Sequence, residues 1–267
     1  MSKHHDRGRR RRTLRTMTAA LAGAAMAALT VTVAAPAYAV IGGTDATEPY
    51  PFMAEVRDAS GNHRCGASLV APDWVLTAAH CASGPDEQGL EVQVGSNDRT
   101  GGGSVRQVAE IVVHPEFSGE PMRLRKDVAL FRLDAPVEQE PIALTGSPAA
   151  PGTPVRAMGW GMTCEDGRFC PEPPVTLQQL DTEIVADERC TGLDVDRCSE
   201  HPSEPAQVCI GDSGGPMVRS TGAGRWELVG VLSRDGDFDR NPLCVGPTVA
   251  SDPSVYAAWI TGVTGTA

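Results

Sequence analysis

The chain has 267 residues, of which 41% are hydrophobic and 21% charged, a composition typical of a globular protein rather than a disordered one. Its 29 glycines and 21 prolines favour many turns and short strands over long helices. Seven of the 23 basic residues and one of the 34 acidic residues lie in residues 1–39, which leaves 16 basic and 33 acidic residues, a net charge of −17. This charge argues against nucleic-acid binding, because phosphate contacts need clustered cations.

Residues 1–39 have the layout of a secretory signal peptide. A basic block, Arg7–Arg15, precedes the uncharged and alanine-rich run Thr16–Ala35, and small residues up to Ala39 form a cleavage site. The run is about as long as a membrane span, but alanine and threonine dominate it, so a cleaved signal is favoured over a retained anchor. Adjacent arginines in the basic block leave open whether export follows the general or the twin-arginine route. We therefore expect a secreted protein.

Short runs that are β-branched or alternate between apolar and polar residues follow the signal. Glycine, proline, asparagine and aspartate separate them, and this regular spacing predicts a barrel or a sandwich. A proline-rich stretch near residue 145 divides the runs, so we expect domains at 40–145 and 146–267. A single helix is expected after Pro253, where apolar residues recur at helical spacing. The expected strands are Ala54–Arg57, Ala67–Val70, Trp74–Thr77, Leu90–Val94, Val105–Val113, Asp127–Leu133, Val155–Gly159, Gln178–Ile184, Pro216–Arg219, Trp226–Ser233 and Thr248–Ala250.

All eight cysteines follow the predicted signal. An even number in an exported chain predicts four disulfides, but spacing alone leaves about 105 pairings open. There is no Cys-x-x-Cys, and His80 is the one histidine beside a cysteine, so no metal site and no cofactor are expected. The cysteines are Cys65, Cys81, Cys164, Cys170, Cys190, Cys198, Cys209 and Cys244.

Three short motifs carry candidate chemistry. They are Thr77–Cys81, Asp127–Phe131 and Gly211–Pro216. Acyl transfer by a serine needs a base to take the hydroxyl proton, an acid to orient that base, and backbone N–H donors for the oxyanion that develops. Glycines beside a serine allow the backbone to turn so that its amides converge. A histidine, an aspartate and a serine are therefore present in an order that suits a serine hydrolase.

The Gly-x-Ser-x-Gly spacing around Ser213 also fits the nucleophile turn of α/β-hydrolases. Those enzymes place their histidine after the serine in the chain, whereas the last histidine here is His201. The α/β-hydrolase interpretation is therefore excluded. We expect His63, His114 and His201 to be structural.

Six motifs in this order resemble the chymotrypsin/trypsin family of serine proteases, in particular its secreted, bacterial-type members. The other three are Val40–Gly43, Gly159–Gly161 and the ending Val255–Ile260. The resemblance covers most of residues 40–267. It implies an all-β fold of two six-stranded antiparallel β-barrels with a short C-terminal helix, and an active site in the cleft between the barrels.

The resemblance also implies a role for each residue of the site. His80 would be the general base, Asp127 the acid that orients it, and Ser213 the nucleophile. The N–H groups of Gly211 and Ser213 would form the oxyanion hole. Ser233 would begin the strand that backs the substrate.

An activation step follows from the same resemblance. Signal cleavage after Ala39 would free the amine of Val40, which would enter a buried salt bridge with Asp212 and hold the oxyanion loop. Cleavage after Ala37 would instead leave Tyr38-Ala39 as a blocking dipeptide. The implied disulfides are Cys65–Cys81, Cys164–Cys170, Cys190–Cys198 and Cys209–Cys244.

The substrate pocket departs from the tryptic pattern. Gln207 stands where tryptic enzymes have the aspartate that binds basic side chains, and Asp235 and Ser254 stand at positions expected to line the pocket wall. Because a neutral glutamine cannot neutralise a guanidinium, we expect relaxed selectivity, with Asp235 or Asp252 as alternative sources of a carboxylate. The calcium-loop carboxylates of the family are not recognisable in Gly95–Ser104, so calcium binding stays open.

The sequence therefore predicts a secreted serine endopeptidase that cleaves peptide bonds through an acyl-enzyme intermediate. Its expected partners are protein or peptide substrates and protein protease inhibitors. We expect a monomer that binds no nucleic acid and no membrane once the signal is removed. The alternatives are a catalytically weak homologue that acts as a protein-binding module, and an esterase on the same scaffold.

Overall fold

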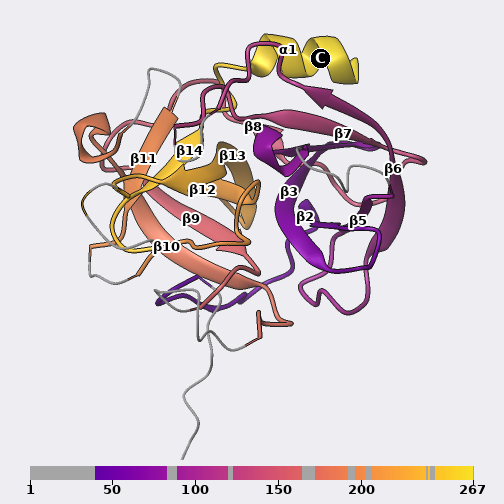
Figure 1. The fold of residues 1–267 in the computed structure, drawn as a ribbon, viewed down its shortest axis with the longest axis horizontal. Coiled ribbons are helices and arrows are strands. Elements are labelled where there is room, and N and C mark those ends of the chain that lie inside the picture. Colours follow the sequence, from indigo (N-terminus) through magenta and orange to yellow (C-terminus); the bar gives the residue numbers. More distant parts are fainter. Residues whose placement is uncertain are drawn as a thin grey trace, which may run out of the picture. The chain divides into compact units, whose positions relative to one another are not determined.

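Strands dominate the chain and close into two six-stranded antiparallel barrels, followed by a C-terminal helix (Figure 1). The structure is a computed structural model that describes residues 40–82, 89–119, 123–163, 172–191, 196–202, 206–238, 240 and 244–266. The all-β fold of two barrels that the resemblance implied is confirmed. The predicted signal peptide lies outside the described residues, and the predicted division at residue 145 stays a prediction.

The first barrel runs from indigo to magenta in Figure 1 and has the strand order β2-β3-β4-β7-β6-β5. Large apolar side chains such as Leu69, Leu76 and Phe131 fill it and are fully buried. Burying such a side chain stabilises the fold by about 1.5–3 kcal/mol. The strands are β2 (Met53–Arg57), β3 (His63–Ala71), β4 (Trp74–Thr77), β5 (Glu91–Val94), β6 (Ser104–Val113) and β7 (Ala129–Leu133).

The second barrel closes through the order β9-β10-β11-β14-β13-β12, with β12 pairing back onto β9. Smaller side chains, among them Val155, Ala157 and Val229, form its core cluster. The strands are β9 (Pro154–Gly159), β10 (Gln178–Val185), β11 (Asp196–Glu200), β12 (Pro216–Gly222), β13 (Arg225–Asp235) and β14 (Thr248–Ser251). Two short strands join this sheet: β1 (Thr44–Asp45) pairs with β10, and β8 (Ala143–Leu144) pairs with β13 in parallel.

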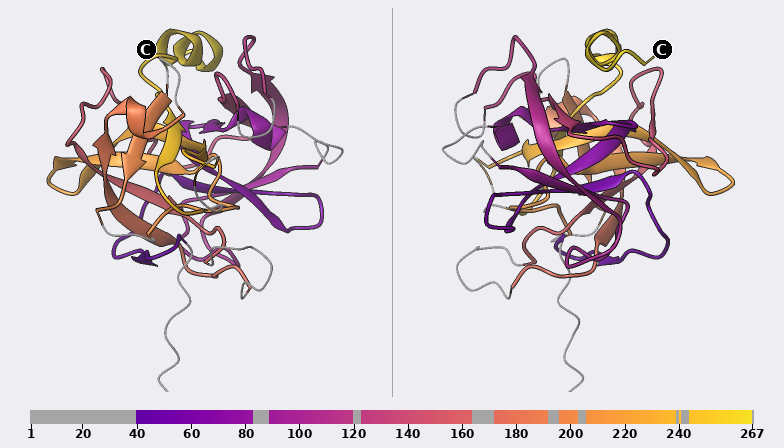
Figure 2. Two further views of the ribbon diagram at one scale, coloured as in Figure 1. Left: turned by 60° about the vertical axis from the view of Figure 1, so that its left-hand side comes forward. Right: turned by 90° about the vertical axis from the view of Figure 1, so that its right-hand side faces the viewer.

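Helix α1 (Ala257–Thr264) follows the second barrel but packs on residues of the first. It ends at Gly265, which adopts the left-handed conformation (φ 70°) that favours glycine at a helix C-terminus. The rings of Tyr256 and Trp259 lie 5.2 and 5.0 Å from the ring of His114, at the end of β6. Figure 2 shows the helix outside both barrels. Within the described ranges, no helix is long and apolar enough to cross a membrane.

Candidate active site

The first barrel brings His80 and Asp127 together. His80 lies in the short 3-10 helix η1 (Ala79–Ala82) directly after β4, and Asp127 comes two residues before β7. Because β4 and β7 are paired, with Thr77 opposite Ala129, the two side chains meet at one end of the barrel. The ring Nδ1 of His80 lies 2.8 Å from Asp127 Oδ2, and the His80 amide donates to Asp127 Oδ1 at 2.9 Å.

The second barrel supplies a further donor to the same carboxylate. The hydroxyl of Ser233, near the end of β13, donates to Asp127 Oδ2 at 2.6 Å. Burial alone would raise the pKa of Asp127, but the hydrogen bonds from His80 and Ser233 outweigh it and hold the pKa below its usual value. Asp127 is therefore an anion that fixes a proton on Nδ1 of His80 and leaves Nε2 free to accept one.

A cavity of about 460 Å³ opens beside His80 and takes its walls from both barrels. Ser213 lines the same cavity, so the predicted nucleophile and the predicted base face one space. Apolar side chains make up much of the wall. The lining residues are His80, Phe117, Gly119, Leu124, Val208, Cys209, Ile210, Ser213, Leu232, Ser233, Arg234, Asp235 and Cys244.

The loop that carries Ser213 is fixed by its own backbone. Gly214 donates to Leu232 O at 2.7 Å, and Ser213 O accepts from Gly66 N at 2.8 Å. Gly211 has φ +99° and Gly214 φ +76°, which other residues rarely adopt. Among the described residues, no acceptor takes the N–H of Gly211 or of Ser213. These two amides, which flank Asp212, are therefore free to donate to an oxyanion, and the predicted oxyanion hole stays a prediction.

Asp212 is fully buried beneath this loop. Its side chain leaves no room for a Cβ at either glycine of the Gly-Trp-Gly motif. Its carboxylate accepts hydrogen bonds from the backbone amides of Gly161 and Cys209, both at 2.8 Å. A Cβ added at Gly159 would lie 2.0 Å from Asp212 Oδ1, and one at Gly161 would lie 2.6 Å from its Cγ. Burial raises the pKa of Asp212 to about 6, although both amides and the nearby His63 oppose the rise.

We expect Gly161→Ala to remove most activity, because the added methyl group would displace the Asp212 carboxylate and with it the oxyanion loop. The cost in stability should be about 1–3 kcal/mol, as for other overpacked sites. Gly146→Ala is the matched control, since a Cβ there meets nothing within 4 Å. The measurement is the turnover of a peptide amide by the two purified variants, each compared with the wild type. Wild-type turnover by Gly161→Ala would contradict this role for the motif.

The predicted mature N-terminus, Val40, lies beside the segment that leads into the Ser213 loop. Ile41 exchanges two backbone hydrogen bonds with Gln207, at 2.8 and 2.9 Å, and Val40 is fully buried. In the continuous chain the nitrogen of Val40 is an uncharged peptide amide, so it cannot form an ion pair. The predicted salt bridge between Val40 and Asp212 therefore stays a prediction for the processed chain.

The structure separates the residues that were predicted to line the substrate pocket. Asp235 and Ser233 lie in the wall of the cavity, whereas Gln207 and Ser254 do not line it. Gln207 donates its side-chain amide to Pro247 O at 2.8 Å. Ser254 lies just before α1 and donates its hydroxyl to Asp252 at 2.7 Å. Strand register explains why Ser254 lies away from the wall, because the β14 residue that pairs with Asp235 is Thr248.

Three of the four implied disulfides are confirmed. The bridge between Cys65 and Cys81 ties β3 to the helix that carries His80, and the bridge at Cys209 joins two segments that line the cavity. The fourth, Cys164–Cys170, lies outside the described residues. The three bridges are Cys65–Cys81, Cys190–Cys198 and Cys209–Cys244.

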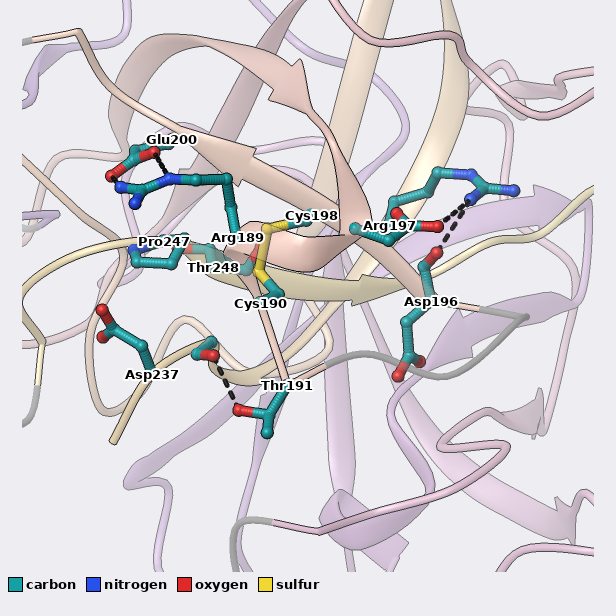
Figure 3. The surroundings of a disulfide bond; sticks show 12 residues. Arg189, Cys190, Thr191, Asp196, Arg197, Cys198, Glu200, Asp237, Pro247 and Thr248 are labelled. Carbon is teal, nitrogen blue, oxygen red and sulfur yellow. Dashed lines mark hydrogen bonds and ion pairs between the residues drawn. A yellow bond between two sulfur atoms is a disulfide. The ribbon is translucent and has the colours of Figure 1, made fainter. Parts of the chain in front are cut away.

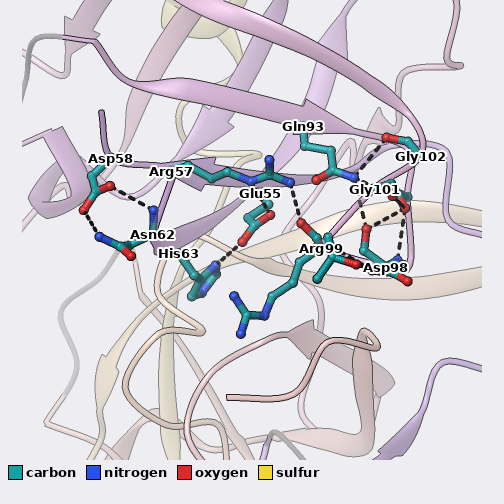
Figure 4. Close-up of polar contacts among 12 residues, drawn as sticks. Glu55, Arg57, Asp58, Asn62, His63, Gln93, Asp98, Arg99, Gly101 and Gly102 are labelled. Carbon is teal, nitrogen blue, oxygen red and sulfur yellow. Dashed lines mark hydrogen bonds and ion pairs between the residues drawn. The ribbon is translucent and has the colours of Figure 1, made fainter. Parts of the chain in front are cut away.

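The contact between His63 and the oxyanion loop carries no signal in the sequence. The ring Nε2 lies 2.8 Å from Gly211 O. The ring Nδ1 lies 3.0 Å from the buried carboxylate of Glu55 (Figure 4). Both ring nitrogens face acceptors, so both hydrogen bonds form only when the ring carries two protons. Arg57 donates to the same carboxylate at 2.8 Å. The expectation that His63 is merely structural therefore omits a link from β2 and β3 to Gly211.

We expect His63→Leu to lower kcat by up to about tenfold with little change in KM, because a lost hydrogen bond of about 0.5–1.5 kcal/mol releases the Gly211 carbonyl. His63→Gln keeps a donor and should lose less. Steady-state kinetics on one peptide amide compares the two. An equal loss in both variants, or a loss confined to KM, would refute the link to the oxyanion loop.

Side chains of the first barrel donate hydrogen bonds to the carbonyl groups of the loop Gly95–Ser104. The side-chain amide of Gln93 donates to the carbonyl oxygens of Asp98, Gly101 and Gly102, at 2.8–3.0 Å (Figure 4). Arg57 donates to the carbonyl of Arg99 at 2.6 Å. Side-chain donors therefore fix this loop from the barrel.

Comparisons with known proteins agree with this geometry. The model of the family described as Trypsin matches residues 40–260. Trypsin of Sarcophaga bullata is 30% identical over 234 residues, covering 83% of this chain and 87% of the relative. Trypsin of Saccharopolyspora erythraea is 32% identical (73% and 86% covered), and granzyme M of Homo sapiens is 33% identical (85% and 89% covered). The chain therefore belongs to the trypsin family of serine endopeptidases.

Proposed function

We propose that the protein is a secreted serine endopeptidase whose triad is His80, Asp127 and Ser213. The observation that carries the proposal is that His80, hydrogen-bonded to the buried Asp127, lines one cavity with Ser213. His80 Nε2 would take the proton of the Ser213 hydroxyl as its oxygen attacks the peptide carbonyl. The same proton would then pass to the leaving amine, and water would hydrolyse the acyl-enzyme by the same route.

The N–H groups of Gly211 and Ser213 would stabilise the oxyanion. Their availability supports this role, because donors that already point at the oxyanion position need no reorganisation during the reaction. Loss of one such donor costs about 2.7–4 kcal/mol in comparable enzymes. Asp212 would hold the loop once the amine of Val40 pairs with it.

Export would precede activity. The basic block, apolar run and small residues of 1–39 support a cleaved signal. Cleavage after Ala39 would yield the activating amine in the same step, without a separate zymogen. The partners would be protein or peptide substrates and protein inhibitors, and the mature enzyme would act as a monomer away from membranes and nucleic acids.

A matched pair of substrates tests the proposal. A peptide amide and the corresponding ester, with the same acyl part, are offered to the protein that begins at Val40. We expect turnover of both, since an endopeptidase stabilises both tetrahedral intermediates. Turnover of the ester alone would identify an esterase, and turnover of neither would identify a binding module.

A further inference from the structure

One charged side chain in the catalytic cavity has no ionic partner. Of the lining residues, Arg234 and Asp235 carry formal charges. Arg234 donates to the Asp196 carboxylate at 2.5 Å, and 4% and 3% of these side chains are exposed, so this pair is neutral and buried. Asp235 forms no ion pair with any residue that the structure describes. Among the described residues that line the cleft, its carboxylate is therefore the uncompensated charge.

Backbone amides hold the Asp235 carboxylate in place. Its Oδ1 accepts from the amide of Asp237 at 2.9 Å, and its Oδ2 accepts from the amide of Cys244 at 3.0 Å. Burial raises the pKa of Asp235, and the charge of Asp237 raises it further, although the two amides oppose the rise. An anion that is partly desolvated and lacks a counter-charge gains when a cation is placed beside it.

The wall behind Asp235 is rigid. Thr191 donates to Gly236 O through its amide at 2.7 Å and its hydroxyl at 2.8 Å, and Gly236 N donates to Pro247 O at 2.8 Å. Thr191 directly follows Cys190, whose disulfide to Cys198 fixes it to β11 (Figure 3). The carboxylate is therefore positioned before any substrate arrives, which lowers the entropic cost of binding.

Asp235 is better placed for this role than the two other residues that were predicted to contribute. Gln207 does not line the cavity and uses its amide on Pro247. Asp252 is fully buried, and Arg197 donates to its carboxylate at 2.7 Å. Relaxed selectivity was expected because Gln207 is neutral, and the carboxylate of Asp235 in the cavity wall favours the alternative in which Asp235 supplies the charge.

We propose that Asp235 binds the basic side chain of the substrate residue before the scissile bond, so that the enzyme selects lysine and arginine there through the wall of the cavity. Asp235 is two residues beyond Ser233 on β13 and contacts the Cys244 amide, beside the bridge to Cys209 and the Ser213 loop. Val208 and Ile210 line the same cavity and offer an apolar surface to the carbon chain of such a side chain. This inference rests on the proposed peptidase function.

Matched peptides that differ in charge alone test the proposal. Lysine is compared with norleucine, and arginine with citrulline, at about 0.15 M salt so that long-range attraction to the acidic surface is screened. We expect kcat/KM to favour lysine over norleucine by about tenfold or more, which corresponds to about 1.4 kcal/mol. Asp235→Asn should bring the ratio close to one. Asp134→Asn removes the same charge from an exposed residue and should keep the wild-type ratio.

Each result decides between the proposals. Equal cleavage of lysine and norleucine peptides by the wild type, or an unchanged ratio in Asp235→Asn, would overturn the role of Asp235 and leave the peptidase function intact. Cleavage of none of the four peptides by the wild type would count against the peptidase function itself. If Asp235→Asn cleaves neither peptide, Asp235→Glu decides, since it keeps the charge: recovery of the lysine preference supports the proposal, and its absence refutes it.

Discussion

Replacing Ser213 with alanine should remove nearly all hydrolysis of a peptide amide while leaving the fold intact. The rate that remains should exceed the uncatalysed reaction by about 10³-fold, because the oxyanion donors and the binding surface are still present. His80→Ala should have a comparable effect, and the double variant should lose little more, since the two residues act as a unit. Single-turnover and steady-state rates on one chromogenic peptide measure this.

Asp127→Asn should cost about 10⁴ in kcat in the same assay. An asparagine amide in place of the carboxylate would donate to Nδ1 of His80 and favour the tautomer that cannot accept the serine proton. Ser147→Ala, at an exposed residue outside the cavity, is the control and should retain wild-type rates. If purified Ser213→Ala kept even a tenth of wild-type turnover, the assignment of the nucleophile would be wrong.

Asp212→Asn should have opposite effects on the stability of the chain that begins at Tyr38 and the chain that begins at Val40. In the longer chain no free amine pairs with Asp212, and burial raises its pKa from 3.8 to about 6. The folded state therefore binds the proton more tightly than the unfolded state, and stability falls as the pH rises from about 4 to about 6. Asparagine removes that penalty, so we expect the longer variant to be at least as stable at pH 7.5.

In the chain that begins at Val40, the free amine would pair with Asp212. Breaking a buried ion pair costs about 3–5 kcal/mol, so Asp212→Asn should lower the free energy of unfolding by about that amount and remove activity. Urea unfolding of all four proteins at pH 7.5 measures both effects. A change of the same sign in the two chains would show that Val40 and Asp212 do not form the activating pair.

Most of the fold could be predicted from local patterns. Eleven of the twelve barrel strands were expected within a few residues of their observed bounds, because apolar and β-branched runs mark them. The missing strand, β11, has the polar sequence Asp-Arg-Cys-Ser-Glu. It is stabilised instead by contacts from elsewhere in the chain: Arg234 donates to its Asp196, and Cys198 is bonded to Cys190. Such partners carry no signal in the strand itself.

The candidate site likewise has one part that local motifs predict and one part that depends on how distant strands pair. Short motifs around His80, Asp127 and Ser213 are local, so the sequence was enough to nominate them. The pocket depends on register: a bulge between Leu232 and Arg234 and the pairing of β13 with β14 determine that Thr248 faces Asp235. Position in the sequence alone could not show that Ser254 lies outside the wall.

Labelling with a serine-directed phosphonate tests the central claim most directly. The protein that begins at Val40 is incubated with an excess of the reagent, digested and mapped by mass spectrometry. The account predicts one phosphonate per molecule on Ser213, with loss of peptidase activity in proportion to labelling, and no label on Ser213→Ala. Labelling of a different serine, or full activity after complete labelling of Ser213, would contradict it.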